Sequence, residues 1–348
     1  MKRYLGRILT LGGISIGAGA AVLALRRQRA PSLRGKAILI TGGSRGLGLA
    51  LARELGRIGC RVAICARSEQ ELEAAAHSIA MDGTEVLTAV CDVCDPSSVH
   101  KCVQTVRSRF GKIDVLINNA GIISVAPLEN TTVADFERAM AVMFWGVLYP
   151  TLAVLPEMKA RGDGSIATIA SIGGKISVPH LLPYSCAKFA AVAFSEGLRA
   201  EVARYGIQVT TIAPGLMRTG SHLKAEFKGQ QDNEATWFIL CATSPLISMG
   251  ASRCARQIIA AVRRGKSEKI LSTQANMIAR MNGLFPGLAP NVLAVVNRLL
   301  PFSTNDPESM VTGKDAVKRG NYLLKVAAGL GQRAAKQFNQ VEPNQPSG

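Results

Sequence analysis

The sequence predicts an α/β protein built on one parallel, doubly wound sheet with helices on both faces. Two observations predict this fold class. Short apolar runs that suit buried strands alternate with longer amphipathic stretches between residues 36 and 264. The first strand also passes through a glycine-rich turn directly into a helix. A chain of 348 residues with 48% hydrophobic content is long enough to bury a large core around such a sheet.

Strand and helix alternate along the whole predicted domain. Residues 36–41 form a buried strand that ends at Gly42, residues 47–58 form the first helix, and the second strand, residues 61–66, ends before Arg67. The remaining elements follow in the same rhythm: helix 68–81, strand 85–91, helix 96–110, strand 113–117, helix 131–160 with possible breaks, strand 164–170, helix 183–205, strand 207–212 and helix 251–264.

An apolar segment precedes this domain. Residues 8–25 carry no charge and are flanked by Lys/Arg on both sides. As a helix this segment is about 27 Å long, close to the roughly 30 Å of a bilayer core. We expect residues 1–30 to be an uncleaved membrane anchor and basic linker; the alternative is a cleaved signal peptide. The arginines at 26, 27 and 29 argue against export and favour a domain that faces the cytoplasm.

The positive charge is concentrated at the two ends. The net charge is +17, yet residues 37–249 carry nineteen Lys/Arg and nineteen Asp/Glu, while residues 1–36 carry eight cations and no acid. No nucleic-acid recognition motif accompanies this charge, so we expect no nucleic-acid partner. Basic ends favour attraction to anionic lipid instead; a soluble protein with basic tails is the alternative.

The region after residue 220 carries fewer signals. Residues 237–240, Trp-Phe-Ile-Leu, suit either a lid over an apolar pocket or a core helix. Residues 278–302 are apolar but interrupted by three prolines, so we expect them to pack on the domain or lie at a membrane interface. We assign residues 31–265 to the main domain, 266–337 to a helical C-terminal extension and 338–348 to a disordered tail.

The eight cysteines do not form a disulfide pattern in a chain of this length, and we expect reduced thiols. Cys91 and Cys94 spell CxxC. A zinc site of this kind needs a second cysteine or histidine pair. The sequence has no second CxxC, and its four histidines do not have the spacing of metal ligands. We therefore expect no metal site.

The glycine-rich turn, TGGSRGLG at residues 41–48, predicts a phosphate site. Gly42, Gly46 and Gly48 allow a tight turn and close backbone approach, so a pyrophosphate can lie at the helix N-terminus. A site for NAD usually places a carboxylate after the second strand, whereas this chain has Ala66 and Arg67. With Arg45 in the turn, we expect NADPH to be preferred over NADH; either arginine is otherwise a solvated surface charge.

Tyr184 and Lys188 stand one helical turn apart on the same face if residues 183–205 are helical. A nearby ammonium favours a phenolate, so we expect Lys188 to lower the pKa of Tyr184. Ser171 lies upstream, across a Gly-Gly pair, and can offer its hydroxyl to a carbonyl that Tyr184 protonates. These three residues are the predicted catalytic set. Taken alone, the Tyr and Lys would be an ordinary surface pair.

In these motifs the chain resembles the short-chain dehydrogenases/reductases, over about residues 34–265. The resemblance rests on TGGSRGLG, Asp92-Val93 after the third strand, Asn118 to Gly121 after the fourth, Ser171, Tyr184 with Lys188, and Pro214-Gly215 with Thr219 beyond. It implies a single Rossmann-type sheet, here with an N-terminal hydrophobic helix and a helical C-terminal extension. It also implies a possible homodimer or homotetramer formed through the long helices.

The resemblance further implies the cofactor contacts. Asp92 would contact the adenine amino group, residues 214–219 would border the nicotinamide, and Lys188 would bind its ribose. Without the resemblance, turn chemistry would explain the asparagines and Pro214-Gly215. The predicted cofactor residues are Gly42, Ser44, Arg45, Gly46, Leu47, Gly48, Arg67, Asp92, Val93, Asn119, Ala120, Gly121, Tyr184, Lys188, Pro214, Gly215 and Thr219.

Met143 departs from the family pattern. The family commonly has an Asn three residues before the glycine at 146, where it holds a water in a proton relay. A thioether is at best a weak acceptor and cannot donate. Another group holds the water, or protons reach Tyr184 directly from solvent, or turnover is slow.

These expectations combine into one hypothesis, one rival from another class, and a third interpretation, a soluble cytosolic reductase with an incidental apolar N-terminus. The hypothesis is a membrane-anchored, NADPH-preferring oxidoreductase that interconverts a ketone or aldehyde and an alcohol on a hydrophobic substrate. The rival is a nucleotide-binding scaffold or redox sensor of the same fold with little turnover; Met143 favours it, and the intact Ser171, Tyr184 and Lys188 disfavour it.

Overall fold

The computed structural model describes residues 31–80, 84–306, 309–320 and 322–340. The chain divides into a unit of residues 1–32 and a unit of residues 33–348. The predicted N-terminal anchor lies outside the described residues, as do residues 341–348 of the predicted tail.

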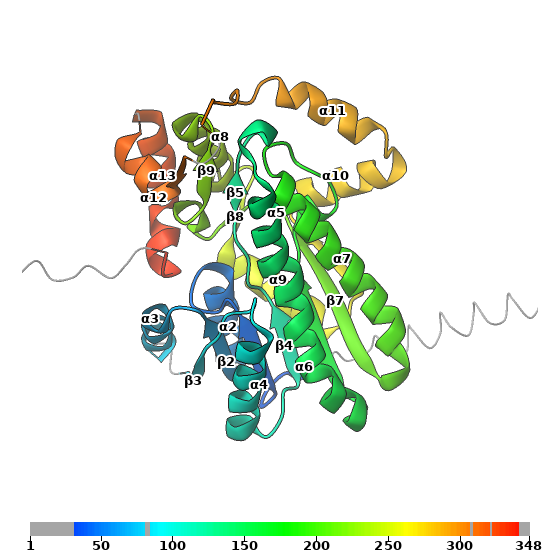
Figure 1. Ribbon diagram of the computed structural model, residues 1–348. Coiled ribbons are helices and arrows are strands. Elements are labelled where there is room, and N and C mark those ends of the chain that lie inside the picture. The colour runs from blue at the N-terminus through cyan, green and yellow to red at the C-terminus, as the bar shows by residue number, and fades with distance from the viewer. Residues whose placement is uncertain (1–30, 81–83, 307–308, 321, 341–348) are drawn as a thin grey trace, which may run out of the picture. The chain divides into compact units, whose positions relative to one another are not determined.

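The centre of the second unit is a seven-stranded sheet in the order β11-β7-β6-β4-β1-β2-β3, with every pair parallel (Figure 1). This confirms the predicted parallel α/β sheet. The strand order reverses at β1, which pairs with both β2 and β4, and ligands bind at such switch points. The strands are β1 (Ala37–Thr41), β2 (Arg61–Ala66), β3 (Val86–Val90), β4 (Val115–Asn118), β6 (Gly164–Ile169), β7 (Ile207–Pro214) and β11 (Glu268–Leu271).

The seventh strand corrects the predicted domain boundary at residue 265. β11 pairs with β7 along its whole length, and Leu271 is buried in the core. Its sequence, EKIL, holds too few apolar residues to be recognised as a strand without its neighbour.

Helices cover both faces of the sheet. On one face α2 (Gly46–Ile58), α3 (Glu69–Ala80) and α9 (Ala251–Arg263) bury a shared apolar cluster. On the other face α4 (Pro96–Phe110), α6 (Gly146–Arg161) and α7 (Leu182–Val202) bury a second one. Every helix predicted between residues 47 and 264 is present. Short 3-10 turns occur at Leu128–Asn130, Ile172–Gly174, Ala203–Tyr205 and Ser221–Leu223.

The long helix predicted over residues 131–160 consists of three parts. α5 (Val133–Met140) and α6 are joined by a π-helical turn, Ala141–Trp145. By length and composition, the run Val133–Arg161 is apolar enough to cross a membrane, with a mean hydropathy of 1.6. Because α6 buries Val154, Leu155 and Met158 in the core against the sheet, packing accounts for this apolar character.

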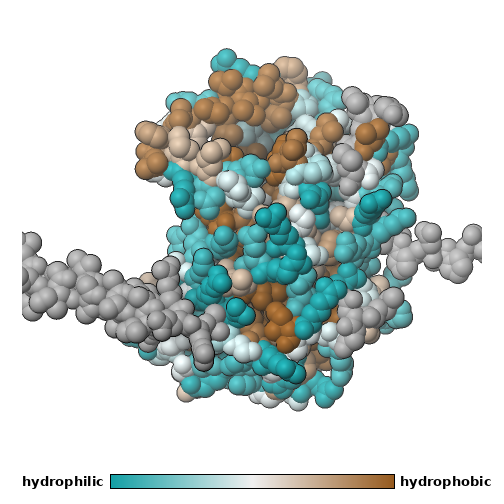
Figure 2. All heavy atoms as spheres, turned by 180° about the vertical axis from the view of Figure 1, so that it is seen from behind, coloured by the Kyte–Doolittle hydropathy of each residue, from teal (hydrophilic) through white to brown (hydrophobic). Residues whose placement is uncertain are grey.

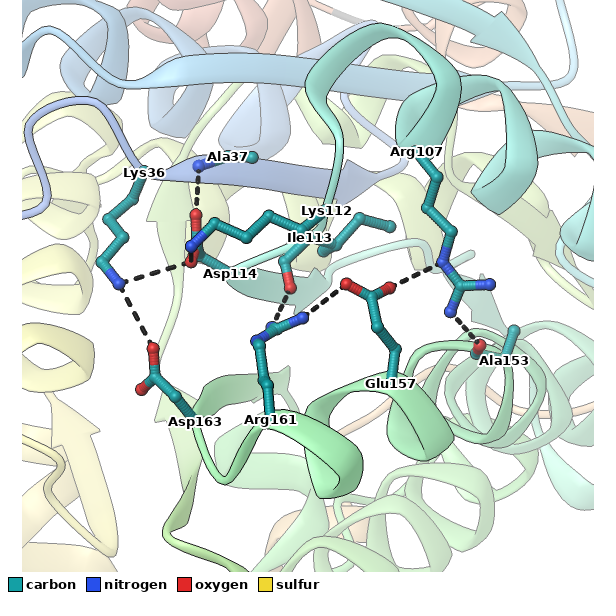
Figure 3. Close-up of polar contacts among 10 residues, drawn as sticks. All are labelled: Lys36, Ala37, Arg107, Lys112, Ile113, Asp114, Ala153, Glu157, Arg161 and Asp163. Carbon is teal, nitrogen blue, oxygen red and sulfur yellow. Dashed lines mark hydrogen bonds and ion pairs between the residues drawn. The ribbon is translucent and has the colours of Figure 1, made fainter.

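Ion pairs fix the opposite end of the sheet from the strand ends that carry the motifs (Figure 3). The buried Asp114 accepts from Ala37 N at 2.9 Å and pairs with Lys36 at 3.3 Å and Lys112 at 3.0 Å. Glu157 of α6 pairs with Arg107 of α4 at 2.7 Å. These contacts join the start of β1 to the start of β4 and α4 to α6.

Segments that follow β7, together with β5, build a smaller layer beside the strand ends. β5 (Ser124–Val125), β9 (Glu226–Lys228) and β12 (Met310–Thr312) form a three-stranded sheet, and β8 (Met217–Arg218) pairs with β10 (Met249–Gly250). α8 (Gln231–Thr243), α12 (Gly313–Arg319) and α13 (Tyr322–Gln337) pack with this sheet around the fully buried Phe227. Phe238 and Ile239 of α8 are buried there, which fits the core-helix alternative for residues 237–240.

Two segments near the C-terminus pack differently: residues 273–297 are almost entirely exposed, whereas Phe338 and Gln340 are buried. α10 (Thr273–Leu284) and α11 (Leu288–Asn297) form a projecting hairpin with Ala275 as their one buried residue. Residues 338–340, by contrast, were predicted to start a disordered tail, but Phe338 and Gln340 are buried. The tail prediction was wrong for these residues because Phe338 inserts into the core cluster beside α2.

Candidate active site

A cavity of about 500 Å³ runs along the carboxyl ends of the strands. Its volume lies within the range of small-molecule and cofactor sites. It extends from Arg67 and Asp92 after β2 and β3 to Tyr184 and Lys188 on α7. The predicted residues that line it are Gly42, Ser44, Arg45, Gly46, Leu47, Arg67, Asp92, Val93, Asn119, Ala120, Gly121, Tyr184, Lys188 and Thr219.

The glycine turn has the geometry that the sequence predicts. Gly42 and Gly46 have φ of +64° and +59°, a region that side chains disfavour. A Cβ on Gly42 would lie 2.8 Å from Ala120 Cα. Asn119 holds the turn, because its Nδ2 donates to the carbonyls of Thr41 at 3.0 Å and Gly42 at 2.9 Å.

Basic side chains dominate one end of the cavity. Arg45, Arg67 and Lys224 line it together with the carboxylates of Glu71 and Asp92. Glu71 pairs with Arg45 at 2.5 Å and with Lys224 at 3.7 Å. Arg67 is exposed, and no ion pair to it occurs within the described residues. The cations here outnumber the carboxylates, which suits a ligand with extra negative charge.

Tyr184 and Lys188 line the other end of the cavity, and Ser171, which does not line it, lies close to Tyr184. Ser171 follows β6, and its Oγ accepts from Gly173 N at 3.0 Å. A Cβ on Gly173 would lie 3.0 Å from Tyr184 Cε1 and 3.5 Å from Ser171 Oγ, so the glycine lets the two side chains meet. Lys188 is 4% exposed and donates from Nζ to Ile169 O at 2.9 Å. Burial of Lys188 excludes an ordinary surface pair.

The pKa shifts of the pair correct one expectation. Burial raises the pKa of Tyr184, and the hydrogen bond from Ser171 only partly opposes this. Burial also lowers the pKa of Lys188 to about 8. We expected Lys188 to lower the pKa of Tyr184, but this pKa is raised. Desolvation of the phenolate outweighs the contacts that stabilise it. Tyr184 is protonated at neutral pH.

Met143 lies beside this pair. It occupies the π-helical turn before α6 and is buried. A Cβ on Gly121 would lie 3.7 Å from Lys188 Nζ and 3.8 Å from Met143 Sδ, so the amine and the thioether flank the same glycine. Such turns occur frequently at functional sites.

Three predicted cofactor residues do not line the cavity. A Cβ on Gly48 would lie 2.2 Å from Gly42 O, so this glycine allows α2 to pack on the turn. Gly215 bonds from N to Leu271 O at 3.1 Å, and its Cα faces Ser272 and Ala275 at the start of α10. Pro214 ends β7 opposite Leu271.

Sequence reasoning missed Glu71, Lys224 and Gln340, all of which line the cavity. Glu71 lies in α3 between Glu69 and Glu73, and such a group of acids is typical of a solvated helix face. Gln340 lies almost 300 residues from the glycine turn that it contacts. No local spacing signals either contact.

A family model described as short chain dehydrogenase matches residues 36–229, more than half of the chain. The chain therefore belongs to the short-chain dehydrogenase family, as the motifs predicted.

Curated relatives extend the similarity. A Bos taurus dehydrogenase/reductase SDR family member 7B is 31% identical over 82% of this chain and 88% of its own length. An Anopheles gambiae dehydrogenase/reductase SDR family protein 7-like is 40% identical over 58% of this chain, and the match covers 65% of that protein. A gluconate 5-dehydrogenase from Burkholderia cenocepacia, solved in complex with NADP and tartrate, shares 30% identity with a TM-score of 0.62 over 73% of this chain and 99% of that chain.

Proposed function

We propose that this protein is an NADPH-preferring oxidoreductase that interconverts a ketone or aldehyde and an alcohol. The observation that carries the proposal is the approach of Ser171 to Tyr184, which lines one end of a cavity together with the buried Lys188; the same cavity also holds the glycine turn.

The residues of the cavity fit a nicotinamide dinucleotide. α2 begins at Gly46, and the amide of the cavity-lining Leu47 in its first turn has no hydrogen-bond partner among the described residues. It can donate to a diphosphate. Asp92 would hold the adenine and Lys188 the ribose of the nicotinamide. When bound, this cofactor supplies or accepts the hydride.

The chain itself supplies the proton. In reduction the Ser171 hydroxyl donates to the carbonyl oxygen, and Tyr184, protonated because burial raises its pKa, gives its proton to the same oxygen. In oxidation the same residues act in reverse. Tyr184→Phe should lower kcat by about 10² to 10⁴, the range for a lost general acid, and leave NADPH binding intact.

A scaffold of the same fold is the rival, and Met143 is the feature in its favour. Unchanged turnover in Tyr184→Phe, or no turnover in the wild-type protein across ketones and alcohols graded by chain length, would support the scaffold and contradict the enzyme.

NADPH preference rests on the cationic end of the cavity. Arg45, Arg67 and Lys224 line this end, and their charges would attract a 2′-phosphate; the gluconate 5-dehydrogenase with the similar fold was solved with NADP. Arg67 is exposed, so Arg67→Ala should fold normally. We expect it to weaken NADPH binding about tenfold and leave NADH binding unchanged. Equal affinity of the wild-type protein for both cofactors would contradict this preference.

We further propose that the substrate is hydrophobic and that the protein binds it at an anionic membrane surface. If residues 8–25 are an anchor, this is the cytoplasmic surface. Eleven of the twenty-three large apolar side chains that are exposed in the described residues fall within residues 277–302. Figure 2 shows the corresponding hydrophobic surface at the top of the molecule. Soluble monomers rarely expose such patches.

The charge around this hairpin favours lipid as its binding partner. From Lys269 to Asn305 the chain has no Asp or Glu but contains Arg280 and Arg298. Apolar side chains with nearby cations fit an anionic bilayer surface. Asn282 of α10 also donates to Lys175 O at 3.0 Å, in the loop between Ser171 and Tyr184, so the hairpin touches the substrate side of the site.

Depth-dependent quenching tests this contact. In the full chain with vesicles of brominated phosphatidylserine, the tryptophan of Leu299→Trp should be quenched. The tryptophan of Val90→Trp, at an exposed position on the far edge strand, should not be. Equal quenching at both positions would contradict the proposal. A dimer that Leu299→Ser abolishes would assign the face to a second copy instead.

A further inference from the structure

The C-terminal residues 337–340 contact the glycine turn directly. Phe338 O accepts from Gly46 N at 2.8 Å. Asn339 Nδ2 donates to the carbonyls of Ser44 at 3.0 Å and Glu71 at 3.2 Å. Arg53 of α2 donates to Gln337 O at 2.8 Å. The end of α13 is therefore joined by hydrogen bonds to the loop and helix that would hold a diphosphate.

These contacts are built into the fold. Phe338 is buried in the core cluster beside α2, and Arg53 lies 6.0 Å from its ring. Asn339 adopts φ of +53°, a conformation that Asn tolerates better than most residues. This turn of the backbone, together with the bond from Gln340 N to Ala335 O at 2.9 Å, fixes Gln340 against the end of α13.

Gln340 lines the cavity as a buried amide with a missing partner. It is 4% exposed. A Cβ on Gly46 would lie 2.9 Å from its Nε2, so the amide lies directly against the turn. Its Oε1 is buried and has no hydrogen-bond partner within the described residues. A buried polar atom left unpaired costs about 1–3 kcal/mol, so a ligand that satisfies it is favoured.

We propose that Gln340 is part of the dinucleotide site and binds the diphosphate and the ribose on the nicotinamide side of the cofactor. Its Nε2 donates to a diphosphate oxygen, and its Oε1 accepts from a ribose hydroxyl. The backbone of residues 337–339 holds the glycine turn in place for this contact. This inference rests on the proposed dinucleotide binding.

Cofactor affinity tests the inference without a known substrate. We expect Gln340→Ala to raise the Kd for NADPH about tenfold, as for the loss of a hydrogen bond to a charged group. Gln340→Glu should weaken binding further, because its carboxylate faces the diphosphate. Gln70→Ala, at an exposed position on α3, is the matched control and should bind like the wild-type protein.

A shorter ligand locates the contact. Adenosine 2′-phosphate contains neither the diphosphate nor the second ribose, so its Kd should be the same for Gln340→Ala and the wild-type protein. Equal NADPH affinity in Gln340→Ala would overturn the inference, as would tighter binding, which would show that Gln340 obstructs the site. Equal weakening for both ligands would overturn it as well, because the effect would then not come from the diphosphate contact. Failure of the wild-type protein to bind NADPH would contradict the proposed function instead.

Discussion

The buried amine of Lys188 is the residue on which the electrostatics of the site depend. It is almost fully enclosed, hydrogen-bonded to Ile169 O, and has a pKa lowered to about 8. Its charge therefore changes near physiological pH, whereas the partly buried phenol of Tyr184 keeps its proton because desolvation raises its pKa.

NADPH affinity should fall as the pH rises through about 8. Protonated Lys188 attracts the phosphate-bearing cofactor and donates three hydrogen bonds, and deprotonation removes both the charge and one donor. Titration calorimetry between pH 6.5 and 9.5 measures this dependence. Lys188→Met should bind more weakly and show a flat profile over this interval. A slope that persists in Lys188→Met would assign the titration to another group.

Met143→Asn should raise turnover several-fold. The side chain lies beside Gly121 and Lys188, where a carboxamide can hold a water and a thioether cannot. Met143→Leu has similar volume and no hydrogen-bonding group, so it should leave kcat unchanged. If both variants match the wild-type kcat, proton supply does not limit turnover.

At the scale of elements, the short turn Ser221–Leu223 carries a buried histidine that makes the C-terminal layer sensitive to acid. His222 lies under α13, where a Cβ on Gly331 would be 2.5 Å from its Cε1. Desolvation lowers its pKa from 6.5 to about 4. The folded protein therefore keeps His222 neutral where the unfolded chain binds a proton.

This histidine should destabilise the fold as the pH falls from 6.5 to 4. In that interval the unfolded state binds more protons, so the free energy of unfolding decreases with decreasing pH. The full shift corresponds to about 3 kcal/mol. Denaturant unfolding of His222→Gln should show a flatter pH dependence. His77→Gln, at an exposed site on α3, should retain the wild-type dependence. The same slope in His222→Gln would contradict this account.

At the scale of the whole molecule, the sheet and the C-terminal third form one folding unit. β11 completes the sheet next to β7, Phe338 packs beside α2, and residues 337–340 hold the glycine turn. Without the residues after 265, the domain that carries the family motifs would lack the strand β11 and the part of the candidate cofactor site that residues 337–340 supply.

A chain that ends at residue 265 should be unstable and aggregate, because the edge of β7 and the apolar surface under Phe338 become exposed. A chain that ends at residue 340 should match the full chain in thermal midpoint. Differential scanning calorimetry compares the two. A cooperative, soluble fold for residues 1–265 would contradict the single folding unit.

The sequence alone determined the parallel sheet and most of the candidate site. Strand periodicity and the glycine turn are local patterns, and Tyr184 and Lys188 are brought together by helical spacing alone. Asp92, Asn119 and Thr219 were predicted from the resemblance to the family, and all three line the cavity.

Only the tertiary structure decided the features that depend on contacts between distant residues. The direction of the Tyr184 pKa shift follows from desolvation, which depends on everything packed around the phenol. Glu71 reaches Arg45 from another helix, β11 is a strand only beside β7, and Gln340 reaches the glycine turn from the other end of the chain. Such contacts leave no local pattern, because the folded chain creates the proximity that a linear spacing cannot encode.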